Sequence, residues 1–92
     1  MIFSVYMVRC ADETLYTGVA IDVARRVDEH NGLTPVGGRS KRGARYTAAR
    51  RPVTLVYTTK IGSRAQAARE EVRLKRLSRA EKLTLAGAEH GP

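Results

Sequence analysis

The chain has 92 residues, of which 42% are hydrophobic and 28% are charged, and its net charge is +8 with a sequence pI near 10.4. This length suits one domain with a modest core and leaves no room for a second recognition module. No apolar run reaches the length of a membrane span, and no signal-peptide pattern opens the chain. Its single cysteine, Cys10, excludes an internal disulfide. We therefore expect residues 1–92 to form one cytoplasmic domain.

The charge is unevenly distributed along the chain. Residues 1–31 carry three basic and five acidic side chains, whereas residues 32–92 carry fourteen basic and four acidic ones. Such an excess of cations indicates a polyanionic partner, most often a nucleic acid. A basic surface that only keeps the protein soluble is the alternative. A membrane partner is disfavoured, because no helix pairs a broad apolar face with a lysine-rich one.

The first third of the chain predicts a β-hairpin followed by a helix. Residues 3–10 and 15–20 are rich in β-branched and aromatic side chains and are separated by a polar turn, as in a hairpin. Asp22 is placed to cap a helix over residues 23–31, which Gly32 ends.

A basic segment and then an apolar strand follow. Residues 32–51 hold four glycines and six basic side chains but no acid, and a loop of this length is usually functional or disordered. Residues 46–48 are expected to form a helical turn within it. The apolar run at residues 52–61 predicts a third strand, with Pro52 at its start.

Two capping boxes predict the helices of the last third, one running to about residue 77 and one ending at Gly87. The capping pairs are Ser63 with Gln66 and Ser78 with Glu81. The order ββαβαα favours an α/β, or α+β, sandwich: a small, mainly antiparallel three-stranded sheet flanked by three helices.

Two tyrosines, Tyr6 and Tyr16, lie about equally far from the hairpin turn. With an even register both side chains emerge on one face, whereas a slip of one residue separates them. A phenol is a poor base unless a cation lowers its pKa, so two tyrosines at the rim of a core are the commoner interpretation. Gly18 indicates a close approach by a backbone or a ligand.

Arg26 and His30 are four residues apart, so they share one face of the first predicted helix. Such a pair offers a fixed cation for a phosphoryl oxygen beside a group that moves protons near neutral pH. A solvated arginine and a histidine at a helix end explain the pattern equally well. A zinc site is disfavoured, because the histidines and Cys10 lack ligand spacing, and Cys10 is expected to be an inert buried thiol.

Glu71 is the most informative acid. It shares its side of the helix with Ala67, Ala68 and Leu74, a small apolar face expected to pack inward. A carboxylate there requires a cation, a hydrogen-bond donor or a metal. The alternative is an ion pair with Lys75, worth roughly 0.2–0.5 kcal/mol.

Together these residues resemble the motifs of the GIY-YIG endonuclease superfamily. Ser4–Tyr6 matches its first motif and Tyr16–Gly18 its second, although Ser4, Val5 and Thr17 depart from the family's usual residues. Arg26, His30 and Asn31 match the helix of the family, and Glu71 matches its distal acid. The chain is most similar to small stand-alone bacterial members and also resembles the catalytic domain of the scaffold-dependent nuclease that cuts branched DNA. The resemblance runs from about residue 3 to 85.

The resemblance implies a metal-dependent DNA endonuclease with little sequence specificity, with branched or nicked DNA in repair or recombination as its expected substrate. Glu71 would hold a single Mg²⁺ or Mn²⁺ ion, and Tyr6 would activate water or itself attack. Tyr16 would orient water or phosphate, and Arg26 would stabilise the pentacovalent phosphate. His30 would assist proton transfer or position a phenol. The residues expected to contact DNA are Gly18, Arg39, Lys41, Arg42, Arg45, Tyr46, Arg50 and Arg51.

Two alternatives keep the fold without catalysis. One is a nucleic-acid-binding module that retains the basic segment, and the other is a small structural protein bound, for example, to ribosomal RNA. An inward-facing carboxylate favours the nuclease, because a binding module has no use for one. A protein partner is expected to supply specificity, and in a bacterium the protein would associate with the nucleoid.

Overall fold

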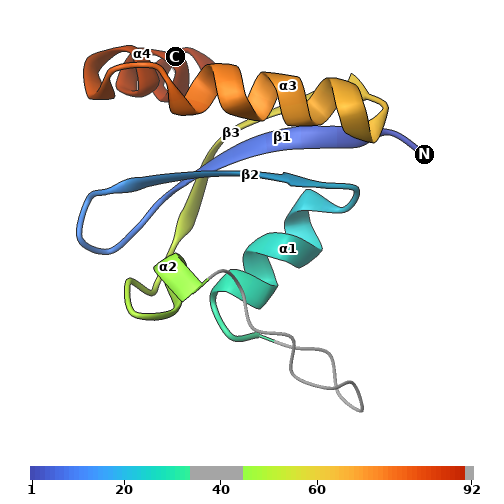
Figure 1. The fold of residues 1–92 in the computed structure, drawn as a ribbon. Helices are drawn as coiled ribbons and strands as arrows, with labels where there is room; N and C mark the ends of the chain where they lie inside the picture. Colours follow the sequence, from blue (N-terminus) through green and yellow to red (C-terminus); the bar gives the residue numbers. More distant parts are fainter. Residues whose placement is uncertain (34–44, 91–92) are drawn as a thin grey trace.

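The computed structural model describes residues 1–33 and 45–90 (Figure 1). Three strands form one antiparallel sheet: β1 (Phe3–Arg9), β2 (Leu15–Ala20) and β3 (Thr54–Gly62). Their order across the sheet is β2-β1-β3, so the first strand is the central one. The predicted hairpin is confirmed, and β2 has the predicted bounds.

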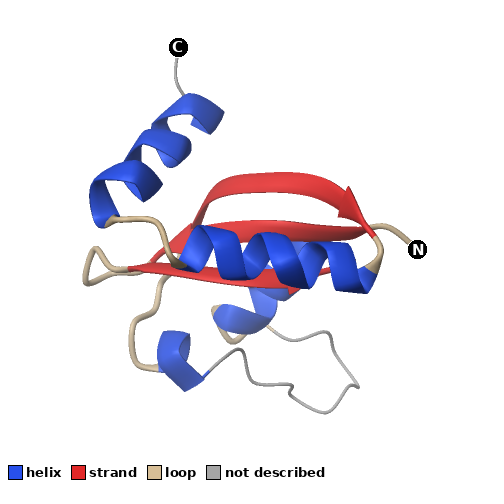
Figure 2. Ribbon diagram, turned by 45° about the horizontal axis from the view of Figure 1, so that its top comes forward, coloured by secondary structure: helices blue, strands red, loops and turns tan. Residues whose placement is uncertain are grey.

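Helices cover both faces of this sheet. Figure 1 shows α1 (Val23–His30) and the short α2 (Arg45–Ala48) on one side, with α3 (Arg64–Lys75) and α4 (Arg79–His90) on the other. Figure 2 shows the same layers by secondary structure, with α3 lying along the sheet. The predicted α+β class and element order are confirmed. No helix in residues 1–33 or 45–90 is long and apolar enough to cross a membrane.

The central strand is buried on both faces, which explains its almost unbroken apolar run. Tyr6 and Val8 belong to the core under α1, while Val5 packs with Ala67 and Leu74 of α3 on the opposite face. Successive side chains of a strand point to opposite faces, so each face receives alternate residues. The strand therefore carries a tyrosine into the α1 layer.

The predicted helix caps are present. Asp22 Oδ1 accepts the Arg25 backbone N–H at 3.0 Å, and Gly32 just after α1 has a positive φ of 76°. Both capping boxes are formed, with distances of 2.8–3.2 Å between side chains and backbone. The first turns of α1, α3 and α4 are thus fixed by the local sequence.

Several boundaries differ from the sequence prediction by one to three residues. The prediction that the last helix ends at Gly87 is wrong, because α4 continues to His90. A glycine inside a helix costs about 1 kcal/mol relative to alanine, which is too little to end a helix that packs through Leu85. The strand β3 begins at Thr54 rather than at Pro52. Cys10 is buried and burial raises its pKa, as expected for an inert thiol.

Candidate active site

The phenol of Tyr6 lies across the edge strand β2 at Gly18. These two residues are partners in the β1–β2 register. A Cβ added at Gly18 would lie 2.5 Å from Tyr6 Oη and 2.6 Å from its Cζ. The close approach expected at Gly18 is thus made by the protein's own tyrosine, whose side chain is almost completely buried.

The register also places Tyr16 on the face of Tyr6. Tyr16 pairs with Val8, two residues beyond Tyr6, so the predicted even register is confirmed. The Tyr16 ring meets the His30 ring edge-on with centroids 5.2 Å apart, and it stacks on Tyr46 of α2 at 5.8 Å. Both predicted tyrosines therefore contact the ring of the same histidine, His30.

His30 is completely buried at the end of α1 and contacts two hydroxyl groups. Its Nε2 lies 2.7 Å from Tyr6 Oη, and its Nδ1 lies 2.7 Å from Thr47 Oγ1. Burial, and secondarily the charge of Arg26, lower its pKa from 6.5 to about 4. The imidazole is therefore neutral at pH 7 and carries one N–H.

Arg26 lies beside the phenol from the preceding turn of α1. Burial raises the pKa of Tyr6 to about 12, and the hydrogen-bonding guanidinium of Arg26 opposes that rise. Arg26 Nη1 also donates to Glu29 Oε1 at 2.8 Å, and Glu29 is itself buried. Glu29 was not predicted as a site residue, although its i, i+3 spacing from Arg26 indicates such a pair. Arg26 and His30 thus share one face of α1, as predicted, and both lie beside the Tyr6 phenol.

The end of α1 is tied to the chain before β3, which fixes His30. Asn31 exchanges two hydrogen bonds with the backbone of Val53, at 2.7 and 3.0 Å. Arg51 Nε donates to the His30 backbone carbonyl at 2.6 Å. Asn31, which matched the family helix motif, therefore acts on the position of the helix end.

Glu71 approaches the site from the other side of the sheet. Its side chain is 25% exposed and lines a pocket of about 500 Å³ with Phe3, Val19 and Ala68, among others. The Glu71 charge contributes to the raised pKa of Tyr6, so the carboxylate is within electrostatic range of the phenol. The edge strand β2 lies between them, with Gly18 under the phenol and Val19 in the pocket.

The helix face of Glu71 is only partly the one predicted. Ala67 and Leu74 are fully buried, whereas Ala68 is exposed and Glu71 lies at the boundary. Glu71 Oε2 also lies 3.3 Å from Lys75 Nζ. The ion pair that the sequence left open is therefore present, while the carboxylate lies at the edge of the buried face rather than within it.

The predicted DNA-contacting residues are only partly described. Arg39, Lys41, Arg42 and the side chain of Arg45 lie outside the described residues. Arg50 Nε donates to Asp12 Oδ2 at 3.0 Å, and its guanidinium lies 4.0 Å from the centroid of the Tyr46 ring. Tyr46 is 38% exposed. Arg50 and Arg51 thus make contacts within the protein, and DNA binding by them stays a prediction.

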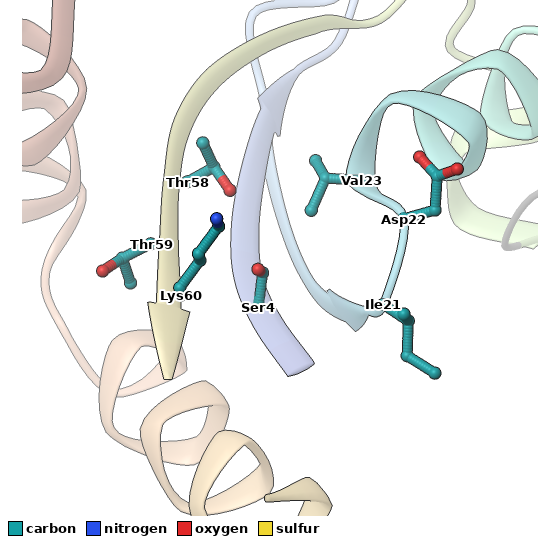
Figure 3. A pocket seen from close by; sticks show the side chains of 7 residues that line it. All are labelled: Ser4, Ile21, Asp22, Val23, Thr58, Thr59 and Lys60. Carbon is teal, nitrogen blue, oxygen red and sulfur yellow. The ribbon is translucent and has the colours of Figure 1, made fainter. Parts of the chain in front are cut away.

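The described part of the chain also forms a pocket that is separate from this cluster. It measures about 600 Å³ and lies between β3 and the start of α1 (Figure 3). Its lining residues are Ser4, Ile21, Asp22, Val23, Thr58, Thr59 and Lys60. None of these was predicted as a site residue, and the catalytic candidates gather elsewhere.

Comparison with known proteins identifies the family. The model of the GIY-YIG catalytic domain matches residues 2–84. The chain belongs to the GIY-YIG family. A UPF0213 protein of Desulfotalea psychrophila is 48% identical over 84 residues, which cover 91% of this chain and 70% of that relative. A UPF0213 protein of Halobacterium salinarum is 47% identical over 81 residues, covering 88% and 95% of the two chains.

A solved GIY-YIG relative has the same fold. The solution NMR structure of a UPF0213 protein from Bacillus halodurans covers 100% of this chain and 89% of its own, with a TM-score of 0.58 and 36% sequence identity. The resemblance inferred from Tyr6, Tyr16, Arg26, His30 and Glu71 is thereby confirmed at the level of the family. Membership of this nuclease family supports a nuclease-type function on DNA with a divalent metal.

In this GIY-YIG domain one carboxylate, that of Glu71, is available as a protein ligand for a divalent metal. The described residues contain no group of three or more His, Cys, Asp and Glu side chains that could bind an ion. The Glu71 carboxylate is half-buried and opens on a pocket, so it can supply one ligand. Mg²⁺ commonly binds through one or two carboxylates and completes its shell with water and substrate phosphates. Glu71 alone therefore satisfies that chemistry.

Proposed function

We propose that this protein is a metal-dependent endonuclease that hydrolyses phosphodiester bonds in DNA with little sequence preference. Branched or nicked DNA in repair or recombination is the proposed substrate, and a protein partner is proposed to supply specificity. The observation that carries the proposal is the 2.7 Å contact between Tyr6 Oη and His30 Nε2, beside Arg26. A phenol, a proton acceptor and a cation at one place suit attack on a phosphate.

The protonation states define what Tyr6 and His30 can do. With pKa values near 12 and 4, the phenol keeps its proton and the imidazole is neutral at pH 7. Tyr6 can therefore take a proton from the attacking water only as it passes its own to His30 Nε2. An anionic phosphate next to His30 favours the imidazolium formed in this step. The pair is thus proposed to act as a proton relay, with Tyr16 orienting water or phosphate.

The remaining groups are proposed to stabilise charge. Arg26, held by Glu29, places a cation beside the phenol, where it would meet the pentacovalent phosphate. A divalent metal on Glu71 would supply the positive charge that stabilises the leaving 3′-oxygen. The basic segment is proposed to receive the DNA backbone, which positions a duplex without reading its sequence, whereas the space at Gly18 is filled by the Tyr6 phenol.

Nicking of supercoiled plasmid and cleavage of branched DNA, with Mg²⁺ or with a chelator, test the proposal. We expect metal-dependent cleavage that falls by about 100-fold or more in Glu71→Gln and in Tyr6→Phe, since each removes a group acting in the transition state. The matched control is Glu70→Gln, because Glu70 pairs with Arg73 on the surface. Equal cleavage by Glu71→Gln and Glu70→Gln, or cleavage in chelator, would contradict the proposal.

One observation favours a non-catalytic nucleic-acid-binding module instead. The Lys75 ammonium lies 3.3 Å from Glu71 and competes with a metal for its carboxylate. On that alternative, all variants bind DNA with a strong dependence on salt and none of them, the wild type included, cleaves it. Lys75→Ala separates the two, because it raises metal-dependent cleavage only if Glu71 is the metal ligand.

A further inference from the structure

We propose that Thr47 is a positioning residue that holds His30 in its Nδ1–H tautomer, and that α2 is anchored to the hairpin turn for this purpose. The proposal deepens the proposed nuclease function and rests on it for its catalytic consequence. Thr47 was not predicted as a site residue, and it lies in a short helix 17 positions after His30 in the sequence.

The geometry ties Thr47 to the proposed proton relay. Thr47 and His30 are both completely buried, and Oγ1 lies 2.7 Å from Nδ1. On the other side of the ring, Nε2 lies 2.7 Å from Tyr6 Oη. The imidazole therefore lies between two hydroxyl groups, each of which can donate or accept a hydrogen bond.

Only one of the two possible proton arrangements serves the relay. If Nδ1 carries the proton, it donates to Thr47 Oγ1, and the Nε2 lone pair accepts the proton of Tyr6. If Nε2 carries the proton, it donates to Tyr6 Oη, and His30 cannot take a proton from the phenol. Which nitrogen is protonated depends on the hydrogen bond made by the other one. A Thr47 hydroxyl that accepts from Nδ1–H therefore selects the active arrangement, and this acceptor role is the part of the proposal that the tautomer measurement tests.

Contacts with the β1–β2 turn hold α2 in place. The backbone N–H of Arg50 donates to the Thr47 carbonyl at 2.9 Å, and Ala11 N–H donates to the Arg50 carbonyl at 2.9 Å. The Arg50 side chain donates to Asp12 at 3.0 Å and to the Tyr46 carbonyl at 2.8 Å. A helix of four residues has no stability of its own in water. These bonds, together with the stacking of Tyr46 on Tyr16, therefore help to keep Thr47 against His30.

Nitrogen-15 NMR of the imidazoles at pH 7 tests the tautomer directly, without any substrate. The chain has two histidines, and the variant His90→Gln assigns the His30 signals. We expect a protonated Nδ1 and an unprotonated Nε2 in the wild type. Thr47→Val, which keeps the shape but removes the acceptor, is expected to move the proton to Nε2, and Thr47→Ser to keep it on Nδ1. A protonated Nε2 in the wild type, or an unchanged tautomer in Thr47→Val, would overturn the proposal.

The same variants link the tautomer to cleavage. Thr47→Val is expected to reduce the cleavage rate by about 10- to 100-fold at unchanged DNA affinity, the range for loss of a group that orients a catalytic residue. Thr47→Ser is expected to restore most of it. If the wild type cleaves no DNA, the proposed function fails, while the NMR result still decides the role of Thr47. Full activity of Thr47→Val despite a changed tautomer would remove Thr47 from the mechanism.

The anchoring of α2 is tested by Asp12→Ala. The net charge rises by one, so electrostatics alone predicts DNA binding that is unchanged or tighter. We expect cleavage to fall nonetheless, since Arg50 loses its partner and Thr47 its support. Asp28→Ala, an exposed position of α1 with the same change in charge, is the matched control. Equal cleavage by Asp12→Ala and Asp28→Ala would show that the turn does not anchor the site.

Discussion

The Tyr6 phenol occupies the space that a side chain at position 18 would fill. A β-carbon there would lie within 2.6 Å of two phenol atoms, far inside van der Waals contact. Gly18→Ala must therefore displace the ring, and we expect a loss of roughly 1–3 kcal/mol in the free energy of unfolding together with most of the cleavage activity. Denaturant unfolding and plasmid nicking measure the two effects. A Gly18→Ala protein as stable and active as the wild type would show that Tyr6 moves freely.

The buried histidine predicts how stability depends on pH. The folded-state pKa of His30 is about 4, below its ordinary value of 6.5, so between these values the unfolded chain binds a proton that the folded protein does not. The free energy of unfolding therefore falls as the pH falls through this window, and its His30 contribution is fully present above pH 6.5. Between pH 6.5 and 5 we expect a loss of roughly 2 kcal/mol.

Urea unfolding at pH 6.5 and pH 5 measures this loss. The carboxylates with lowered pKa values, such as Glu70, titrate below that interval, and the histidine variants assign the remaining change. His30→Gln is expected to flatten the dependence, whereas His90→Gln is expected to leave it unchanged. A slope that survives His30→Gln would assign the effect to another group.

At the residue scale, the spacing of residues along a strand or helix predicted which side chains share a face of that element. The hairpin spacing predicted Tyr6 and Tyr16 on one face for an even register, and the i, i+4 spacing predicted Arg26 and His30 on one helix face, while the family resemblance joined the four in one site. Thr47 could not be found in this way, because its bond to His30 joins residues 17 positions apart with no periodic relation between them. Non-local partners depend on packing that no single stretch of sequence encodes.

At the scale of elements, helix starts were predicted better than helix ends. The capping boxes fix a start through hydrogen bonds between residues three apart, which the sequence displays directly. A glycine ends a helix only where the backbone takes a positive φ, as at Gly32. At Gly87 the chain stays helical instead, because α4 is held by its packing on the sheet.

Gly87→Ala follows from that difference. The position is helical, and an added Cβ would meet no atom within 4 Å. Alanine should therefore raise the free energy of unfolding by about 0.5–1 kcal/mol, since it lowers the conformational entropy of the unfolded chain at no steric cost. Thermal or urea unfolding measures it. The variant is also a control for Gly18→Ala, because the same change at a crowded glycine is expected to have the opposite sign.

At the scale of the molecule, the proposed site uses both layers of the sandwich. Tyr6 and His30 lie in the α1 layer and Glu71 comes from α3, so only the edge strand β2 separates them. The sequence could predict that Glu71 lies on the side of α3 that carries Ala67 and Leu74, but not that only the edge strand would separate it from the phenol, since strand order is a property of the whole fold. Because β2 is an edge strand next to β1, it is the strand that lies between Glu71 and Tyr6.

The charge distribution of the whole chain makes a final prediction about DNA binding. Its cations are concentrated after residue 31, and three of them, Arg39, Lys41 and Arg42, lie within four positions. Each phosphate contact steepens the dependence of log K on log[salt] by about 0.9. Replacing all three by glutamine should therefore make the slope shallower by roughly 2–3, because the released counterions are fewer, and should weaken binding to all sequences alike.

The matched control replaces three exposed cations by glutamine, two in α3 and one at its C-cap, on the side of the helix away from Glu71: Arg69, Arg73 and Arg76. Both triple variants lose the same net charge, so a purely non-specific attraction would weaken equally in the two. If residues 39–42 contact the backbone, only their replacement changes the salt slope, because counterion release counts contacts rather than total charge. Titration of a labelled duplex at several salt concentrations measures both slopes. Equal slopes in the two variants would mean that the basic segment is not the binding surface.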